Sequence, residues 1–346
     1  MSDLKYLLIY GGLDDAHVRF PERILRQKGI ACAFYDPLRL ARVNLEPLNV
    51  EMKAEICAET LISSGGKEEV ESIKLLVPEQ ISYIWVRNKK FVDCIESSSD
   101  QWAYVSVNEH TNFLKSLIRL YDIKHFNDIY RVSSIKHKAV QISIAKDVGF
   151  RVPQTLISSH KKKIVSFIEK YNDIIVKPMS LNFVPPPLDK STSFATILTN
   201  SVTKEEIARA SRESLAAAPA IYQKRIEKAY EIRLAAFGND AVAYRIDSQK
   251  SQSGELDWRR AQYEDIYAPM NATGEMRELS RRFLHASGLH YGIFDLIVDT
   301  EGQLWFLECN ADGQWAWLER QGEGPIAEMF ARNISRMIKS TFRMAS

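Results

Sequence analysis

One segment near the C-terminal end, residues 293–310, most limits what this chain can fold into. Two apolar runs flank a short polar turn that contains a glycine, a pattern typical of a β-hairpin. If residues 301–302 form the loop, Asp295 lies directly opposite Glu308 on the neighbouring strand. Asn310 lies two residues further on and points to the same face of the sheet. The segment predicts a hairpin that carries two facing carboxylates and an amide.

A cation between these side chains is the interpretation that we favour. Like charges placed opposite each other destabilise a sheet, whereas carboxylate and amide oxygens suit Mg²⁺, which usually also binds substrate phosphates. The alternative is a hairpin with one polar face in water. The surrounding residues, among them Phe294 and Phe306, are strongly apolar and favour burial. We therefore expect Asp295, Glu308 and Asn310 to hold a magnesium ion.

The composition is that of an ordinary globular protein and excludes several classes. At 346 residues the chain is long enough for two or three packed lobes. It has no apolar run long enough to span a membrane, and its apolar N-terminal segment is too short for a signal peptide. The four cysteines are scattered without metal-binding spacing, which indicates a reduced, cytoplasmic protein. The net charge of +2 gives no support for a nucleic-acid-binding surface.

The first part of the chain predicts a parallel α/β layer. Residues 4–10 and 31–35 are apolar strands, and a helix between them is expected to begin near Pro21 and to end at Gly29. A further strand covers residues 81–86, whereas residues 43–80 are less regular.

The rest of the chain predicts a succession of helices and antiparallel strands. Polar residues from Asp247 to Pro269 are expected to form a loop. Thr203 opens a capping box that begins a helix. Helices are expected within 108–149, after 203, over 275–287 and after Pro325, and strands over 152–157, 174–177, 220–226, 231–237 and 241–247.

Two lysines stand next to structured elements. Lys138 lies early in a helix, and Lys177 ends an apolar strand, where a charge is costly without a partner. Taken singly, each is more often a solvated surface lysine. A buried phosphate would explain both.

Two further clusters of charged residues also have both a functional and a purely structural interpretation. Glu231 and Arg233 alternate with apolar residues and share one side of a strand, which is either a functional face or a salt-bridged edge. In the loop, Arg259 and Arg260 follow Asp257; an arginine fork holds phosphate or carboxylate well, although most loop arginines are simply solvated.

The order of these residues along the chain resembles the ATP-grasp superfamily. The ordered set is Lys138, Lys177, residues 223–233, Asp295, and Glu308 with Asn310. The resemblance implies an α/β ATP-grasp fold, with ATP and Mg²⁺ as cofactors. It implies an N-terminal pre-ATP-grasp domain over residues 1–125, a central lobe over 126–200 and a C-terminal lobe with the Mg-ATP site over 201–346.

Finer features resemble one branch of this superfamily, the microviridin-type peptide cyclases, also called graspetide synthetases, whose relatives include the ribosomal-protein glutamate ligases. Residues 306–319, FLECNADGQWAWLE, are similar to the FLE-N-x-x-GQW-x-W-x-E run of that branch. Residues 84–87, 152–157 and 247–259 also resemble it.

Position by position, the resemblance implies a role for each candidate residue. Lys138 and Lys177 would bind the ATP phosphates. Gln223 and the backbone of Arg225 and Ile226 would meet adenine, and Glu231 would meet the ribose. Arg233 and Arg259 would face the transferred phosphate or an acyl phosphate, and the metal ligands would be Asp295, Glu308 and Asn310.

The implied activity is an ATP-dependent ligase that activates Asp or Glu side chains of a precursor peptide and forms ω-ester or ω-amide crosslinks with Ser, Thr or Lys. The alternatives are an ATP-grasp ligase for a free amino acid or amine, and a nucleotide-binding regulator without catalysis. The last is favoured only by the absence of glycine between Lys177 and Ser201. A homodimer is implied by the resemblance alone. We expect Cys309 and Trp315 to serve packing, as well as Trp317, although one tryptophan could line a substrate channel.

Overall fold

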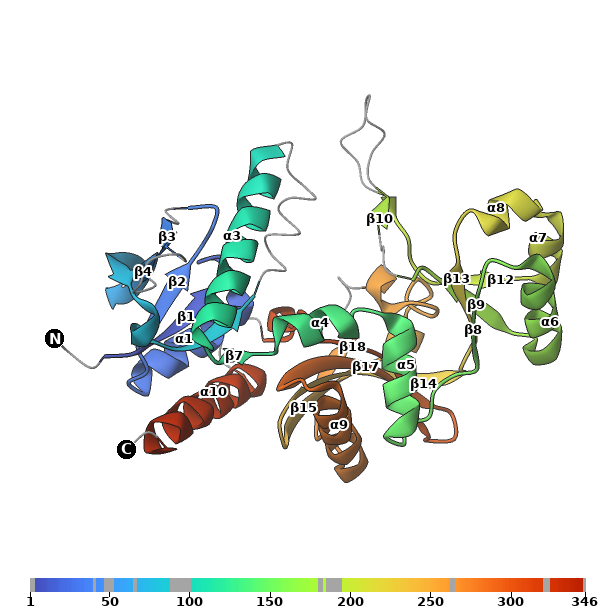
Figure 1. Cartoon of the computed structure of the whole chain (residues 1–346). Helices are drawn as coiled ribbons and strands as arrows, with labels where there is room; N and C mark the ends of the chain where they lie inside the picture. The colour runs from blue at the N-terminus through green and yellow to red at the C-terminus, as the bar shows by residue number, and fades with distance from the viewer. Residues whose placement is uncertain are drawn as a thin grey trace. The chain divides into compact units, whose positions relative to one another are not determined.

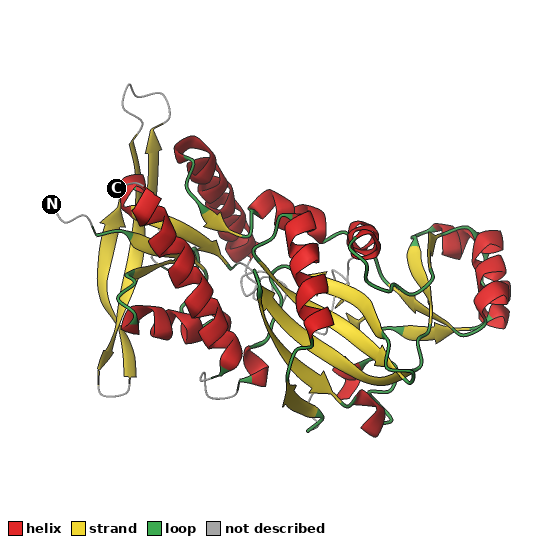
Figure 2. Cartoon of the chain, turned by 90° about the horizontal axis from the view of Figure 1, so that it is seen from below, coloured by secondary structure: helices red, strands yellow, loops and turns green. Residues whose placement is uncertain are grey.

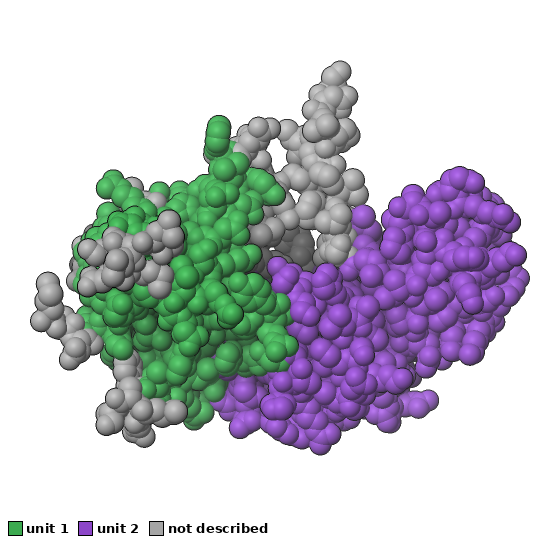
Figure 3. All heavy atoms as spheres, viewed as in Figure 1, with its two compact units in different colours: residues 1–132, 288–290, 314–346 green, residues 133–287, 291–313 purple. Residues whose placement is uncertain are grey.

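The computed structural model describes residues 4–39, 42–46, 53–64, 67–87, 101–179, 183–184, 195–261, 265–319 and 324–344. The chain divides into two compact units (Figure 3), and each is built from segments that are not contiguous in the sequence. Unit 1 comprises residues 1–132, 288–290 and 314–346, and unit 2 comprises residues 133–287 and 291–313. The three domains expected from the sequence, with boundaries after residues 125 and 200, stay a prediction.

Unit 1 is an α/β layer around a parallel centre (Figure 1). Strand β1 (Tyr6–Tyr10) pairs in parallel with β2 (Cys32–Tyr35) on one side and with β6 (Ile81–Val86) on the other. All five residues of β1 are buried, as expected for a parallel strand that is covered on both faces. The strands predicted over residues 4–10, 31–35 and 81–86 are thereby confirmed.

Helices from both ends of the chain cover this sheet. One face packs against α3 (Gln101–Tyr121) through a shared apolar cluster. Helices α1 (Ala16–Gln27) and α10 (Pro325–Met344) pack against each other, and Phe330 of α10 stacks on Trp85 of β6 with 6.1 Å between the ring centroids. The last helix of the sequence therefore completes the core of the first strands.

Two sequence predictions for unit 1 are wrong. Helix α1 begins before Pro21, because Asp15 caps it by accepting a hydrogen bond from the His17 amide at 3.0 Å. Residues 43–80 are not irregular, since β4 (Lys53–Ser64) and β5 (Lys67–Leu76) form a long antiparallel pair and β3 pairs with β4. The remaining elements of unit 1 are β3 (Val43–Glu46), a 3₁₀ turn at Pro78–Gln80, β7 (His125–Phe126), α4 (Ile129–Ile135), which runs into unit 2, and a 3₁₀ turn at Ala316–Leu318.

Part of the 306–319 run has a structural role. Glu319 is buried, and its carboxylate accepts hydrogen bonds from the backbone amides of Ile326 (2.5 Å) and Ala327 (3.1 Å) at the start of α10. Trp315 is also buried and stacks on Phe330 with 5.6 Å between the ring centroids. The packing role expected for Trp315 is confirmed.

Unit 2 contains a smaller antiparallel sheet with the strand order β12-β9-β13-β8. Helix α6 packs on this sheet with α7 and α8 beside it, around the buried residues Ile164 and Ile168. The capping box predicted at Thr203 is present, since Thr203 and Glu206 exchange hydrogen bonds at the start of α7. These elements are α5 (Lys138–Asp147), β8 (Thr155–Ser158), α6 (Lys161–Tyr171), β9 (Ile174–Lys177), β12 (Asn200–Val202), α7 (Lys204–Arg209), α8 (Arg212–Ala216) and β13 (Ala220–Lys224), with β10 (Phe183–Val184) paired to β11 (Ala195–Thr196).

A larger antiparallel sheet of unit 2 has the strand order β16-β15-β14-β17-β18. Helices α5 and α9 lie side by side on one face of it (Figures 1 and 2), over a core that includes Phe283, Phe294 and Phe306. The segment expected to be a loop up to Pro269 contains one strand of this sheet. The elements are β14 (Lys228–Phe237), β15 (Asp240–Ile246), 3₁₀ turns at Ser248–Lys250 and Trp258–Ala261, β16 (Tyr267–Met270), α9 (Gly274–Ser287), β17 (Tyr291–Asp299) and β18 (Leu304–Asn310).

The predicted hairpin is β17 with β18, and Asp295 pairs with Glu308 as expected. The loop, however, has three residues rather than two, because the amide of Asp299 donates to the carbonyl of Gln303 and Gly302 has a φ of 80°. This shifts the register by one residue. A β-bulge between Asp295 and Leu296 shifts it back.

Within the described part of the chain, no helix combines the length and the apolar character that crossing a bilayer requires.

Candidate functional site

The two facing carboxylates of the hairpin each have a cationic partner. Arg233 on β14 pairs with Asp295 in the sheet register, and its guanidinium lies 2.6 Å from Asp295 Oδ1. Lys138, the first residue of α5, places its Nζ 2.9 Å from Glu308 Oε2. Asn310 donates its side-chain amide to Glu308 Oε1 at 3.1 Å. The two carboxylates therefore lie opposite each other as predicted, and each forms an ion pair with a cationic side chain.

The environment affects the two carboxylates differently. Burial raises the pKa of Asp295 to about 6; the charge of Glu308 adds to this rise and Arg233 opposes it. Burial would also raise the pKa of Glu308, but the attraction of Lys138 and Arg259 outweighs it and holds that pKa well below its ordinary value.

This donor set fits a hard cation. Two carboxylates and one amide gather on one face of a hairpin, and rotation of the Asn310 amide would present oxygen in place of nitrogen. Among the residues that the structure describes, no group of three His, Cys, Asp or Glu side chains could hold a metal ion. Mg²⁺ is typically bound by one or two carboxylates together with waters and phosphate oxygens.

The second lysine has an amide as its partner. Lys177, the last residue of β9, donates to Gln223 Oε1 at 3.0 Å, and Gln223 Nε2 donates to Thr155 Oγ1 at 2.9 Å. Burial lowers the pKa of Lys177 to about 8, and repulsion from Lys138 adds to the effect. An anion next to both ammonium groups would relieve this repulsion.

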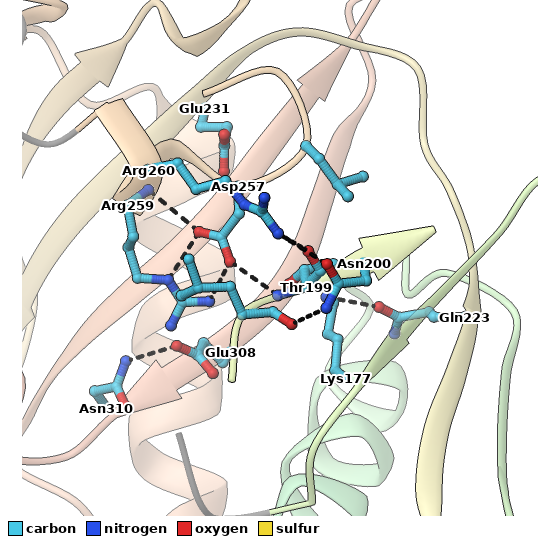
Figure 4. A network of polar contacts seen from close by, with 12 residues as sticks. Lys177, Thr199, Asn200, Gln223, Glu231, Asp257, Arg259, Arg260, Glu308 and Asn310 are labelled. Atoms are coloured by element: carbon cyan, nitrogen blue, oxygen red, sulfur yellow. Dashed lines mark hydrogen bonds and ion pairs between the residues drawn. The ribbon is translucent and has the colours of Figure 1, made fainter. Parts of the chain in front are cut away.

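Arg259 is fixed by a buried aspartate (Figure 4). Asp257 accepts hydrogen bonds from Arg259 Nε (2.8 Å) and Nη2 (2.7 Å), and also from the backbone amide of Thr199 at 3.3 Å. Burial opposes ionisation of Asp257, but these contacts with Arg259 hold its pKa at about 2. Arg260 donates to the carbonyl of Thr199 (3.0 Å) and to Asn200 Oδ1 (2.9 Å). The loop over residues 248–261 is therefore joined to the start of β12.

Lys228 and Asp257 line the cavity, although the sequence interpretation assigned neither of them a role. The ammonium of Lys228 lies 2.7 Å from Glu231 Oε1. Residues three apart in a regular strand face opposite ways, but a β-bulge between Lys228 and Tyr230 brings this pair together. The spacing of Asp257 two residues before Arg259 was an available signal, whereas the bulge has no signature in the sequence.

These groups line one cavity within unit 2, and this cavity is partly open to solvent. The backbone amide of Arg225 donates to the carbonyl of Asp173, and its guanidinium pairs with Glu255 at 2.7 Å. Arg233 and Asn310 reach the site by contacting Asp295 and Glu308. The predicted residues in the lining are Lys138, Lys177, Gln223, Arg225, Ile226, Glu231, Arg259, Asp295 and Glu308.

The fold is the ATP-grasp fold, as comparison with solved structures shows. A RiPP-associated ATP-grasp ligase of Chryseobacterium gregarium, in complex with ADP and a leader and core peptide, has a TM-score of 0.77 and 20% identity, covering 98% of this chain and 97% of that one. Macrocyclase MdnC of Microcystis aeruginosa, bound with precursor peptide MdnA, has a TM-score of 0.73 and 21% identity, covering 95% and 98%. The ATP-grasp ligase PsnB, complexed with a precursor variant, Mg and ADP, has a TM-score of 0.68 and 17% identity, covering 96% and 99%.

No protein-family model and no curated protein matches the chain.

Proposed function

We propose that this protein is an ATP-dependent ligase that crosslinks a ribosomally made precursor peptide. The observation that carries the proposal is a single cavity in which a carboxylate pair meets two lysines and an aspartate-held arginine. Support comes from solved structures of the same fold, which match over nearly the whole chain and hold ADP, Mg or precursor peptides. Two lysines and an arginine suit the charge neutralisation that phosphoryl transfer requires.

In this proposal different side chains of the cavity hold the metal ion, the adenine, the ribose and the phosphates. Asp295, Glu308 and Asn310 would hold Mg²⁺, which when bound neutralises phosphate charge. Gln223 and the backbone of Arg225 and Ile226 would meet adenine. Lys138 and Lys177 would hold phosphates, Glu231 would hold the ribose, and Arg233 and Arg259 would face the transferred phosphoryl group.

The proposed reaction proceeds in two steps. A side-chain carboxylate of the peptide attacks the γ-phosphorus of ATP, and ADP leaves, which gives an acyl phosphate. A Ser or Thr hydroxyl, or a Lys amine, of the same peptide then attacks the acyl carbon; phosphate leaves, and the nucleophile loses its proton. The peptide loses one water for each ester or amide formed. Tethering gives the nucleophile a high effective concentration.

The test is to measure ADP release with Mg²⁺ and ATP, with and without a candidate precursor peptide, and to read the peptide mass in the same sample. Peptide-dependent ADP release with a mass loss of about 18 Da per ring supports the proposal. ADP release only with an added amino acid or amine, and a matching mass gain, would instead establish the alternative ligase.

We further propose that the protein acts as a homodimer in the reducing cytoplasm. The cysteines Cys32, Cys57 and Cys309 form no disulfide in the described part of the chain, and Cys32 and Cys309 are buried. Light scattering of the purified protein tests the dimer.

A further inference from the structure

Lys228 is a buried ammonium group that the proposed reaction does not use. Its side chain is 7% exposed and that of Glu231 is 6% exposed, and the two form an ion pair at 2.7 Å. Lys228 also donates to the carbonyl of Leu256 at 3.3 Å. All three residues line the cavity. A buried ammonium group needs partners of this kind, so Lys228 holds both the Glu231 carboxylate and the Leu256 carbonyl in position.

The two partners belong to different parts of the site. Glu231 is the residue proposed to meet the nucleotide sugar, and it lies on β14. Leu256 directly precedes Asp257, which holds Arg259 through two hydrogen bonds. Lys228 is therefore a direct connection between the proposed sugar contact and the loop that carries the phosphate-facing arginine.

We propose that Lys228 is a positioning residue, which orients Glu231 toward the sugar of the nucleotide and holds the 248–261 loop against β14. This inference rests on the proposed function, because it assigns a partner to one of its nucleotide contacts. The side chain acts through Glu231 and Leu256. Without the ammonium, Glu231 would be a buried carboxylate that has lost its paired cation, and nothing in this contact would hold it in place.

Calorimetry of ADP, 2′-deoxy-ADP and 3′-deoxy-ADP binding in the presence of Mg²⁺ tests the sugar contact. The full-length protein should prefer ADP over at least one deoxy analogue by about 10-fold, the value of one hydrogen bond to a charged group. Lys228→Met should reduce this ratio toward one, as should Glu231→Gln. Because both changes remove the same contact, the double variant should show the same preference for ADP as Glu231→Gln alone. Lys228→Arg should restore part of the preference.

Lys250→Met is the matched control, since Lys250 lies on the same loop with its side chain 73% exposed. It should keep the wild-type ratio. Hydrogen exchange supplies a second measurement: bound ADP should protect the 248–261 loop in the wild type and much less in Lys228→Met.

A Lys228→Met protein that melts earlier but keeps the wild-type preference would overturn the inference, since a purely structural lysine would behave in this way. A wild-type protein that binds the three nucleotides equally would overturn it too. A wild-type protein that binds no ADP would instead refute the proposed function.

Discussion

At the scale of single residues, the carboxylate pair is the part of the site most accessible to sequence reasoning. Counting along a hairpin needs only strand alternation, and it placed Asp295 opposite Glu308. The partners of these residues were harder to predict, because contacts such as Lys138 with Glu308 join residues that are 170 positions apart. Propensity and periodicity report on neighbours in sequence and carry no information on such pairs.

Glu308→Gln should abolish ATP turnover and leave the protein folded. The change removes a charge that Lys138 now offsets and that the proposed cation requires, and losses of at least about 100-fold are typical for such groups. Turnover assays with circular dichroism on the same sample measure both properties. Glu301→Gln, at the exposed turn of the same hairpin, is the control and should behave as wild type. A folded Glu308→Gln protein with normal turnover would refute the metal assignment.

ATP affinity should weaken as the pH rises through about 8. Lys177 is charged below its pKa, which burial lowers to about 8, so the free site loses a positive charge above that pH. An ordinary lysine would keep its charge to beyond pH 10. The KM for ATP between pH 7 and pH 9 measures this effect. Lys177→Arg keeps its charge throughout and should give a flatter profile; equal slopes for the two proteins would contradict the expectation.

At the scale of elements, sequence patterns identified most strands and helices and failed where a local irregularity decides the geometry. The hairpin loop was predicted one residue too short, and an unpredicted bulge in the hairpin restored the register. Proline was taken as the start of α1, although Asp15 caps that helix six residues earlier. Most of the glycine-free segment between Lys177 and Ser201 lies outside the described residues.

The 248–261 loop should be sensitive to the volume at Gly254. A Cβ at this position would lie 2.9 Å from the Cβ of Ala261 and 3.2 Å from the carbonyl of Ser248, so the loop would have to shift. Gly254→Ala should cost about 1–3 kcal/mol of stability and lower turnover by displacing Arg259. Gly274→Ala, where nothing lies within 4 Å, is the matched control. Urea unfolding and turnover are the measurements, and identical behaviour of the two variants would contradict this account.

At the scale of the whole molecule, the class of fold was predictable and the grouping of segments was not. The order of the candidate site residues along the chain resembled the ATP-grasp superfamily, and the fold agrees. Unit 1, however, joins residues 1–132 to residues 314–346. An amphipathic pattern shows that α10 has an apolar face, but not which distant strand that face covers.

Phe330→Ala should therefore destabilise the core of unit 1, although Phe330 lies near the C-terminal end of the chain and most of unit 1 comes from residues 1–132. The ring is 1% exposed and stacks on both Trp85 and Trp315. Removing it leaves a cavity between elements that are far apart in sequence, at a cost of about 3–5 kcal/mol. Urea unfolding followed by tryptophan fluorescence measures the loss, with Leu120→Ala as the control because that side chain is 42% exposed. Phe330→Leu should recover part of the loss, since it refills part of the volume. A cost below about 1 kcal/mol for Phe330→Ala would mean that the C-terminal helix contributes little to this core.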